Sequence, residues 1–132
     1  MPRFVVLLHK TPAGYPRGAH FDLMLEQGDV LRTWALDGLP AAGETVLGER
    51  LPDHRTAYLD FEGAVAGERG SVSRVDSGQY EVLEETAGRL IIRLRGDKLS
   101  GTMKLIAADN DQAHRWRVSL SADRLAVAGG AL

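Results

Sequence analysis

Apolar and polar residues alternate with a period of two along most of the chain, a pattern typical of strands with one buried face. The alternation is strict at residues 20–26 and 89–95, and residues 4–10 are mostly apolar. Other extended segments are expected at 30–36, 45–51, 56–66, 71–76, 79–84, 98–107 and 114–120. Their even spacing predicts an all-β fold: a compact antiparallel β-barrel of about eight strands with little helix.

Short turn signals separate these segments. Gly28 and Asp29 predict a hairpin over residues 20–36, and Ser77 with Gly78 predicts a second hairpin between 71–76 and 79–84. A tight turn is expected at residues 96–97, a turn at 52–54 and a polar loop at 109–111.

The chain of 132 residues is long enough for one domain with one hydrophobic core. We expect that domain to span residues 1–121, followed by a tail at 122–132. A short Ala-rich stretch at 122–128 is the best helical candidate, and it ends in two glycines.

The absence of cysteine excludes disulfides, thiolate metal sites and a cysteine nucleophile. A metal would have to be held by His, Asp or Glu, a ligand set that favours Mn²⁺, Mg²⁺, Zn²⁺ or Fe²⁺. The net charge of −2 argues against a non-specific duplex binder, so contacts with nucleic acid should be local. The apolar run near the N-terminus is too short for a signal peptide and no stretch could span a bilayer, which predicts a cytoplasmic protein without a membrane partner.

The segment 20–26 is the strongest candidate for chemistry. His20 and Asp22 share one strand face, roughly 6–7 Å apart at the backbone, and could converge on one cation. A solvated strand face explains the same spacing. His9 is a candidate third ligand if residues 4–10 lie beside residues 20–26, and an edge histidine facing water is the alternative.

His54 and Tyr58 are the other candidates, since a histidine near a phosphate can transfer a proton and a tyrosine can donate a hydrogen bond. A loop histidine and a strand tyrosine facing solvent are the plain alternatives. The sequence contains no G-x-S-x-G or Walker-type motif, and residues 67–70 (GERG) are typical of a turn rather than a phosphate cradle.

Four segments resemble the 3′-phosphoesterase module of bacterial DNA ligase D, and the standalone proteins that carry this module resemble the chain still more closely. HFDLMLE (20–26) and VLRTWAL (30–36) are similar to its His-aromatic-Asp strand and the strand that follows. DHRTAYLDFEG (53–63) resembles its Asp-His-Pro-x-x-Tyr-x-x-Phe-Glu-Gly block, and KLSGT (98–102) resembles a later strand.

The resemblance implies a β-barrel that trims 3′ ends of DNA and RNA, removing a ribonucleotide and a 3′-phosphate, with Mn²⁺ as the favoured metal. By position it implies that His9, His20 and Asp22 are metal ligands. It also implies that His54 and Tyr58 are catalytic residues at the phosphate. The expected protein partner is then a DNA ligase or another end-joining protein, and the chain itself is expected to be a monomer.

The chain departs from the family at two arginines that bind phosphate. Met24 and Val46 stand in their places. Arg50 lies on the same strand face as Val46 and is the candidate to replace its arginine as a catalytic residue. The segment 11–18 is an insertion whose Arg17 could also reach the phosphate.

Three functions remain open from the sequence. The first is the metal-dependent phosphoesterase, and the second is a non-catalytic module that binds a nucleic-acid end or a repair partner, as Met24 and Val46 suggest. The third is a small-molecule metalloenzyme on a cupin-like barrel. It ranks last because it leaves residues 53–63 unexplained.

Overall fold

The computed structural model describes residues 1–108 and 114–122. These residues form nine strands and one 3-10 helix. In chain order they are β1 (Arg3–Lys10), β2 (His20–Gln27), β3 (Val30–Leu36), β4 (Thr45–Arg55), η1 (Thr56–Leu59), β5 (Gly63–Ala64), β6 (Ser71–Thr86), β7 (Arg89–Gly96), β8 (Ser100–Ala107) and β9 (Arg115–Ser121).

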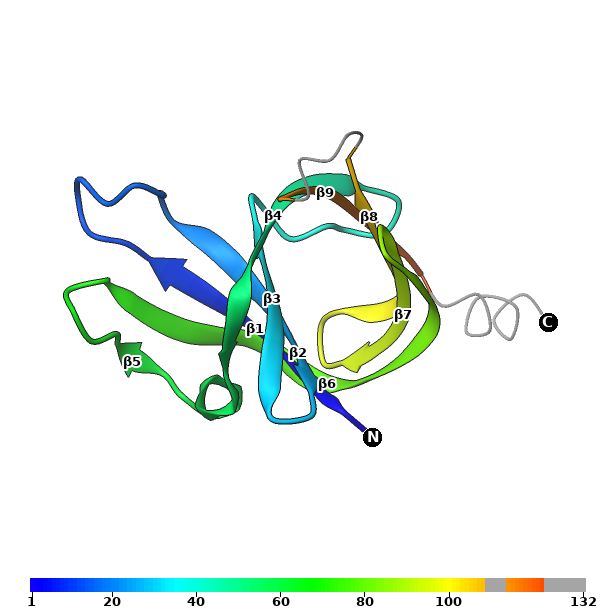
Figure 1. Cartoon of the computed structure of the whole chain (residues 1–132), viewed down its shortest axis with the longest axis horizontal. Coiled ribbons are helices and arrows are strands. Elements are labelled where there is room, and N and C mark those ends of the chain that lie inside the picture. Colours follow the sequence, from blue (N-terminus) through cyan, green and yellow to red (C-terminus); the bar gives the residue numbers. More distant parts are fainter. Residues whose placement is uncertain (109–113, 123–132) are drawn as a thin grey trace.

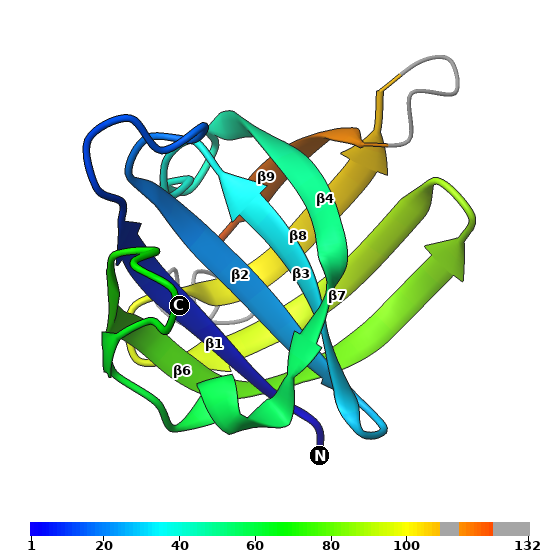
Figure 2. The same ribbon diagram turned by 60° about the vertical axis from the view of Figure 1, so that its left-hand side comes forward.

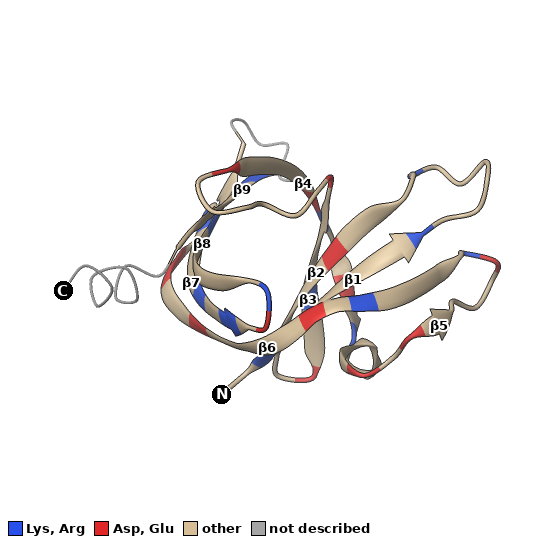
Figure 3. Ribbon diagram, turned by 180° about the vertical axis from the view of Figure 1, so that it is seen from behind, with Lys and Arg blue, Asp and Glu red and all other residues tan. Residues whose placement is uncertain are grey.

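The sheet closes on itself as a ring of eight antiparallel strands, in the order β1-β2-β3-β4-β9-β8-β7-β6, with β6 returning to β1. Figure 1 looks along the ring, and Figure 2 shows the strands crossing it obliquely. The short β5 pairs with β6 outside the ring. The all-β prediction is therefore confirmed. Positions with Lys or Arg and positions with Asp or Glu both occur on strands around the ring (Figure 3).

The main core fills the inside of the ring, because alternate residues of every ring strand point inward. Trp34 and Trp116 meet edge to face there, with 5.6 Å between ring centroids. The buried members of this core are Phe4, Val6, Leu23, Leu25, Trp34, Leu36, Tyr80, Leu90, Ile92, Leu94, Leu99, Met103, Leu105, Trp116, Val118 and Leu120.

A second, smaller core lies on the outer face of β1, β2 and β3. Val5, Leu7, Met24 and Leu31 lie in this core, with Leu59, Val65 and Val72 and with the partly buried Tyr58 and Phe61 packed against them. The chain between β4 and β6 thus folds back over the outside of the ring. The 2.8 Å ion pair between Arg3 and Asp60 joins this covering segment to the start of β1.

The predicted hairpin turn at Ser77 and Gly78 is wrong, because β6 runs straight through both residues. Gly78 pairs with Phe4 of β1 on one side and with Gly96 of β7 on the other. A Cβ on Gly78 would collide with the carbonyl oxygen of Arg95. This glycine therefore permits a close approach of three strands rather than a change of direction.

Two further predictions change around the covering segment. Residues 52–54 lie within β4 rather than in a turn, and residues 56–66 hold a 3-10 helix and the short β5 rather than one strand. The turns after β2 and after β7 are confirmed. The predicted loop at 109–111 and most of the 122–128 helical candidate lie outside the described residues. Within the part described, no helix is long and apolar enough to cross a membrane.

Candidate metal centre

The register of β1 against β2 brings three predicted ligands together. His9 lies directly opposite His20, and Asp22 is opposite Leu7, so all three side chains point from the outer face. Candidate ligand atoms of His9, His20 and Asp22 all lie within 4.8 Å of one another. Residues 4–10 thus lie beside residues 20–26, the condition under which the sequence made His9 a candidate third ligand.

Main-chain carbonyls orient both imidazoles. Nε2 of His9 is 2.7 Å from the carbonyl oxygen of Arg69, and Nδ1 of His20 is 2.9 Å from the carbonyl oxygen of Gly18. Because a carbonyl can only accept, each of these nitrogens carries a proton and donates. The remaining nitrogens, Nδ1 of His9 and Nε2 of His20, lie 3.5 and 3.0 Å from the Asp22 carboxylate.

Asp22 is only 3% exposed, and the nitrogen that faces its Oδ1 is Nε2 of His20, at 3.0 Å. A buried carboxylate without compensation is costly, so this position attracts positive charge. Burial lowers the pKa of His20, but Asp22 and the Gly18 carbonyl outweigh that effect, so its pKa lies above the ordinary value. Two imidazole nitrogens and one carboxylate fit a divalent cation such as Mn²⁺, Zn²⁺ or Fe²⁺.

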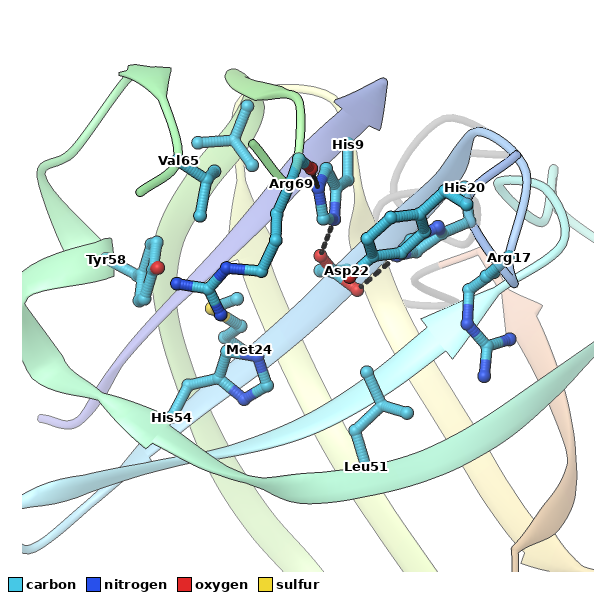
Figure 4. A pocket seen from close by; sticks show the side chains of 12 residues that line it. His9, Arg17, His20, Asp22, Met24, Leu51, His54, Tyr58, Val65 and Arg69 are labelled. Carbon is cyan, nitrogen blue, oxygen red and sulfur yellow. Dashed lines mark hydrogen bonds and ion pairs between the residues drawn. The ribbon is translucent and has the colours of Figure 1, made fainter. Parts of the chain in front are cut away.

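The three residues lie at one end of a cavity of about 210 Å³ that also contains His54 and Tyr58 (Figure 4). Nδ1 of His54 donates to the carbonyl oxygen of Pro52 at 2.8 Å, which leaves Nε2 as the chemically available nitrogen. The rings of His54 and Tyr58 meet edge to face, with 5.8 Å between centroids. The structure therefore brings five of the six predicted site residues into one cavity.

The sixth, Arg50, does not line this cavity. It is paired with Trp34 across β3 and β4, and its guanidinium carbon lies 4.5 Å from the Trp34 ring centroid. Val46 packs against the inner core. Val46 and Arg50 therefore share one face of β4, as expected. That face points to the inside of the ring.

Sequence reasoning missed two cavity residues with polar side chains, Tyr15 and Arg69, and left Arg17 as an open suggestion. Tyr15 and Arg17 come from the 11–18 insertion, and Arg17 forms an ion pair with Glu49. Arg69 comes from the turn between β5 and β6, which the sequence correctly identifies as a turn. No local signal marks Arg69, because only the return of β6 to β1 places it beside His9.

Known proteins match most of this chain. Residues 9–107 match the family described as the DNA ligase D 3′-phosphoesterase domain. The multifunctional non-homologous end joining protein LigD of Mycobacterium bovis is 33% identical over 114 residues, covering 78% of this chain and 15% of that protein. Its counterpart in Mycolicibacterium smegmatis is 32% identical over 133 residues, covering 87% of this chain and 17% of that protein. The chain thus spans less than a fifth of the length of these relatives, and it belongs to the DNA ligase D 3′-phosphoesterase domain family.

Proposed function

We propose that this chain is a divalent-metal-dependent phosphoesterase, with Mn²⁺ as the metal, that processes 3′ ends of DNA or RNA during DNA repair. It removes a terminal 3′-ribonucleotide and a 3′-phosphate. It works in the cytoplasm as a monomer beside a DNA ligase or another end-joining protein, in keeping with the end-joining relatives.

One observation carries the proposal. The carboxylate of Asp22 is buried, and Nδ1 of His9 and Nε2 of His20 face it at 3.5 and 3.0 Å. Their opposite nitrogens are held by carbonyls, an arrangement typical of metal-ligating histidines. This cluster shares its cavity with His54 and Tyr58, two residues suited to a phosphate.

Each residue has a role at the reacting phosphate. His9, His20 and Asp22 would hold the cation, which when bound neutralises phosphate charge and polarises the phosphorus–oxygen bond. Nε2 of His54 is the nitrogen that would carry a proton to the leaving oxygen once the imidazole is protonated there, because Nδ1 is committed to Pro52. The Tyr58 hydroxyl donates to a phosphate oxygen and stabilises charge that develops in the transition state.

Asp22→Asn tests the proposal, because it keeps the shape of the side chain and removes the ligand charge. The substrates are DNA primers that end in a 3′-phosphate or in one ribonucleotide. We expect the wild type to process both with Mn²⁺, and Asp22→Asn to lose at least about a hundredfold in kcat/KM and most of its Mn²⁺ affinity by titration calorimetry.

Asp29→Asn is the matched control, since Asp29 is exposed in the turn between β2 and β3. It should retain wild-type turnover and Mn²⁺ affinity. Undiminished Mn²⁺-dependent activity in Asp22→Asn would contradict the assigned site.

The second candidate is a module that binds a 3′ end without turnover, and Met24 favours it. This side chain is 1% exposed and lines the cavity where a guanidinium would bind phosphate in the family pattern. The same primers separate the two functions: tight binding of 3′-phosphate ends without any product would support this module and overturn the enzyme.

A further inference from the structure

Guanidinium groups outnumber carboxylates among the residues that line the cavity. Asp22 is the only carboxylate among its lining residues, whereas Arg17 and Arg69 both contribute guanidinium groups. A cation held by His9, His20 and Asp22 would add to this excess. The cavity is therefore suited to an anion, whereas elsewhere charges of both signs are interspersed around the ring (Figure 3).

The two arginines differ in whether a nearby carboxylate neutralises their charge. Arg17 is neutralised by its ion pair with Glu49. Nε of Arg69 donates to the carbonyl oxygen of Ala66 at 2.7 Å, and no carboxylate of the described residues lies within ion-pair distance of its guanidinium. Figure 4 shows this side chain reaching from beside His9 across the cavity toward Tyr58 and His54. Its terminal nitrogens are thus available to a ligand.

The turn that carries Arg69 is held firmly in place. The amide of Val65 donates to the carbonyl oxygen of Gly70 at 2.8 Å, which closes the turn. Glu68 has a φ of 55°, the one positive value outside glycine in the described chain. A non-glycine residue in this region costs energy and marks a backbone fixed by its surroundings. Together with the His9 hydrogen bond, these contacts fix where the Arg69 side chain starts.

Met24 leaves room for that side chain. Met24, Leu51, Val65 and Val72 give the cavity apolar walls, and such walls strengthen an interaction between a guanidinium and an anion. Figure 4 shows the Arg69 guanidinium in front of the Met24 sulfur. An arginine at position 24 would bring a second guanidinium into the same part of the cavity.

We propose that Arg69 is the phosphate-binding cation of this cavity and that its ligand is the terminal 3′-phosphomonoester of a nucleic acid. Arg69 binds the phosphate from the turn between β5 and β6, whereas the methionine at position 24 on β2 offers no positive charge. The planar guanidinium can pair with two oxygens of a phosphate at once, and a terminal monoester has three such oxygens. This inference rests on the proposed function, because it names the substrate group bound at the same site.

Binding in the absence of metal tests Arg69 separately from turnover. Fluorescence anisotropy in EDTA compares twelve-nucleotide DNA strands that end in a 3′-phosphate or in a 3′-hydroxyl. We expect the wild type to prefer the 3′-phosphate strand, and Arg69→Ala to lose that preference by about ten- to a hundredfold with little change for the hydroxyl strand.

Two controls make the result specific. Arg95→Ala removes the same charge from β7, where the side chain lines none of the described cavities, and should keep the preference. Met24→Arg combined with Arg69→Ala returns a guanidinium to the cavity from β2. This double variant should recover most of the preference for the 3′-phosphate strand. If Arg69→Ala does not fold, Arg69→Lys, which keeps the charge without the fork, should show an intermediate preference.

Equal preference in the wild type and in Arg69→Ala would overturn the role of Arg69, as would a wild type without any preference. The proposed function fails independently, if the wild type with Mn²⁺ releases no phosphate from the same strand. A wild type that binds the 3′-phosphate through Arg69 without turnover would support the role of Arg69 and contradict the proposed phosphoesterase activity. Normal turnover by the wild type, with an unchanged preference for the 3′-phosphate strand in Arg69→Ala, would support the phosphoesterase activity and contradict the role of Arg69.

Discussion

The imidazole of His9 donates a hydrogen bond to the main-chain carbonyl of Arg69, with 2.7 Å between Nε2 and the oxygen. One bond therefore joins a candidate metal ligand on β1 to the turn that carries the candidate phosphate-binding residue. Partners of this kind orient metal-ligating histidines, and their loss typically lowers metal affinity about 10- to 100-fold. The position of the turn should thus influence both parts of the site.

Gly70→Ala should disturb both parts through this bond. Gly70 has a φ of +92°, and a Cβ there would collide with the carbonyl oxygen of Lys10 at the end of β1. The turn must move away from β1, so His9 loses the orientation of its ring. We expect a loss of about 2–3 kcal/mol in the free energy of unfolding, measured in urea, and a roughly tenfold weaker Mn²⁺ affinity by calorimetry.

Gly67→Ala is the matched control for Gly70→Ala. Gly67 also has a positive φ of +80°, but a Cβ there would only reach the Arg69 Nε at 3.6 Å, an ordinary contact. It should cost about 1–2 kcal/mol in stability, as a left-handed alanine does, and leave Mn²⁺ affinity near that of the wild type. If both variants bind Mn²⁺ equally well, the turn does not orient His9.

Mn²⁺ should stabilise the folded chain through His20. A ligand at roughly 100 times its Kd adds about 2.7 kcal/mol to the free energy of unfolding when it binds only the native state. The wild type should therefore melt at a higher temperature with Mn²⁺, and His20→Ala should lose most of that increase. His114→Ala removes an exposed histidine outside the cavity and should keep it. An equal increase in all three proteins would place the metal elsewhere.

The grouping of His9, His20 and Asp22 could be predicted because strand alternation is a local property. His20 and Asp22 lie two residues apart on β2, so any register keeps them on one face. Adding His9 required only that β1 pair with β2, the simplest antiparallel arrangement for neighbouring strands. The closed eight-stranded ring follows similarly from even strand spacing and short turns.

The rest of the site depends on contacts that no local pattern contains. Ser77 and Gly78 resemble a hairpin turn, yet they lie where β6 passes from β1 to β7. The same long strand fixes the turn at Arg69 beside His9. A glycine that permits close approach and a glycine that permits a turn look alike in sequence, so the route of β6 could not be predicted.

Arg50→Ala separates the predicted catalytic role of Arg50 from a packing role. Its guanidinium lies over the Trp34 ring and 3.4 Å from Asp53, and its Nε is buried without a hydrogen-bond partner among the described residues. We expect a loss of about 1 kcal/mol in the free energy of unfolding from the cation–π contact and the buried stem. A lost preference for 3′-phosphate strands with unchanged stability would instead assign Arg50 to the phosphate.

Asp76→Asn should be the most destabilising isosteric change outside the cavity. The Asp76 carboxylate is 3% exposed and accepts four backbone hydrogen bonds, from Ser77 and Asp97 at Oδ1 and from Lys98 and Leu99 at Oδ2, at 2.7–3.1 Å. It thereby fixes the turn between β7 and β8 against β6, where the ring closes. An asparagine would turn its amide donors toward two of these N–H groups.

The expected loss is about 3 kcal/mol, since hydrogen bonds to a charged group contribute about 1.5–3 kcal/mol each and the remaining acceptor still serves two donors. Urea unfolding measures it, with Asp97→Asn as the control because Asp97 is exposed in the same turn. That control should change stability by less than about 0.5 kcal/mol. Equal stabilities for the two variants would mean that the ring closes without help from Asp76, through strand pairing and the inner core alone.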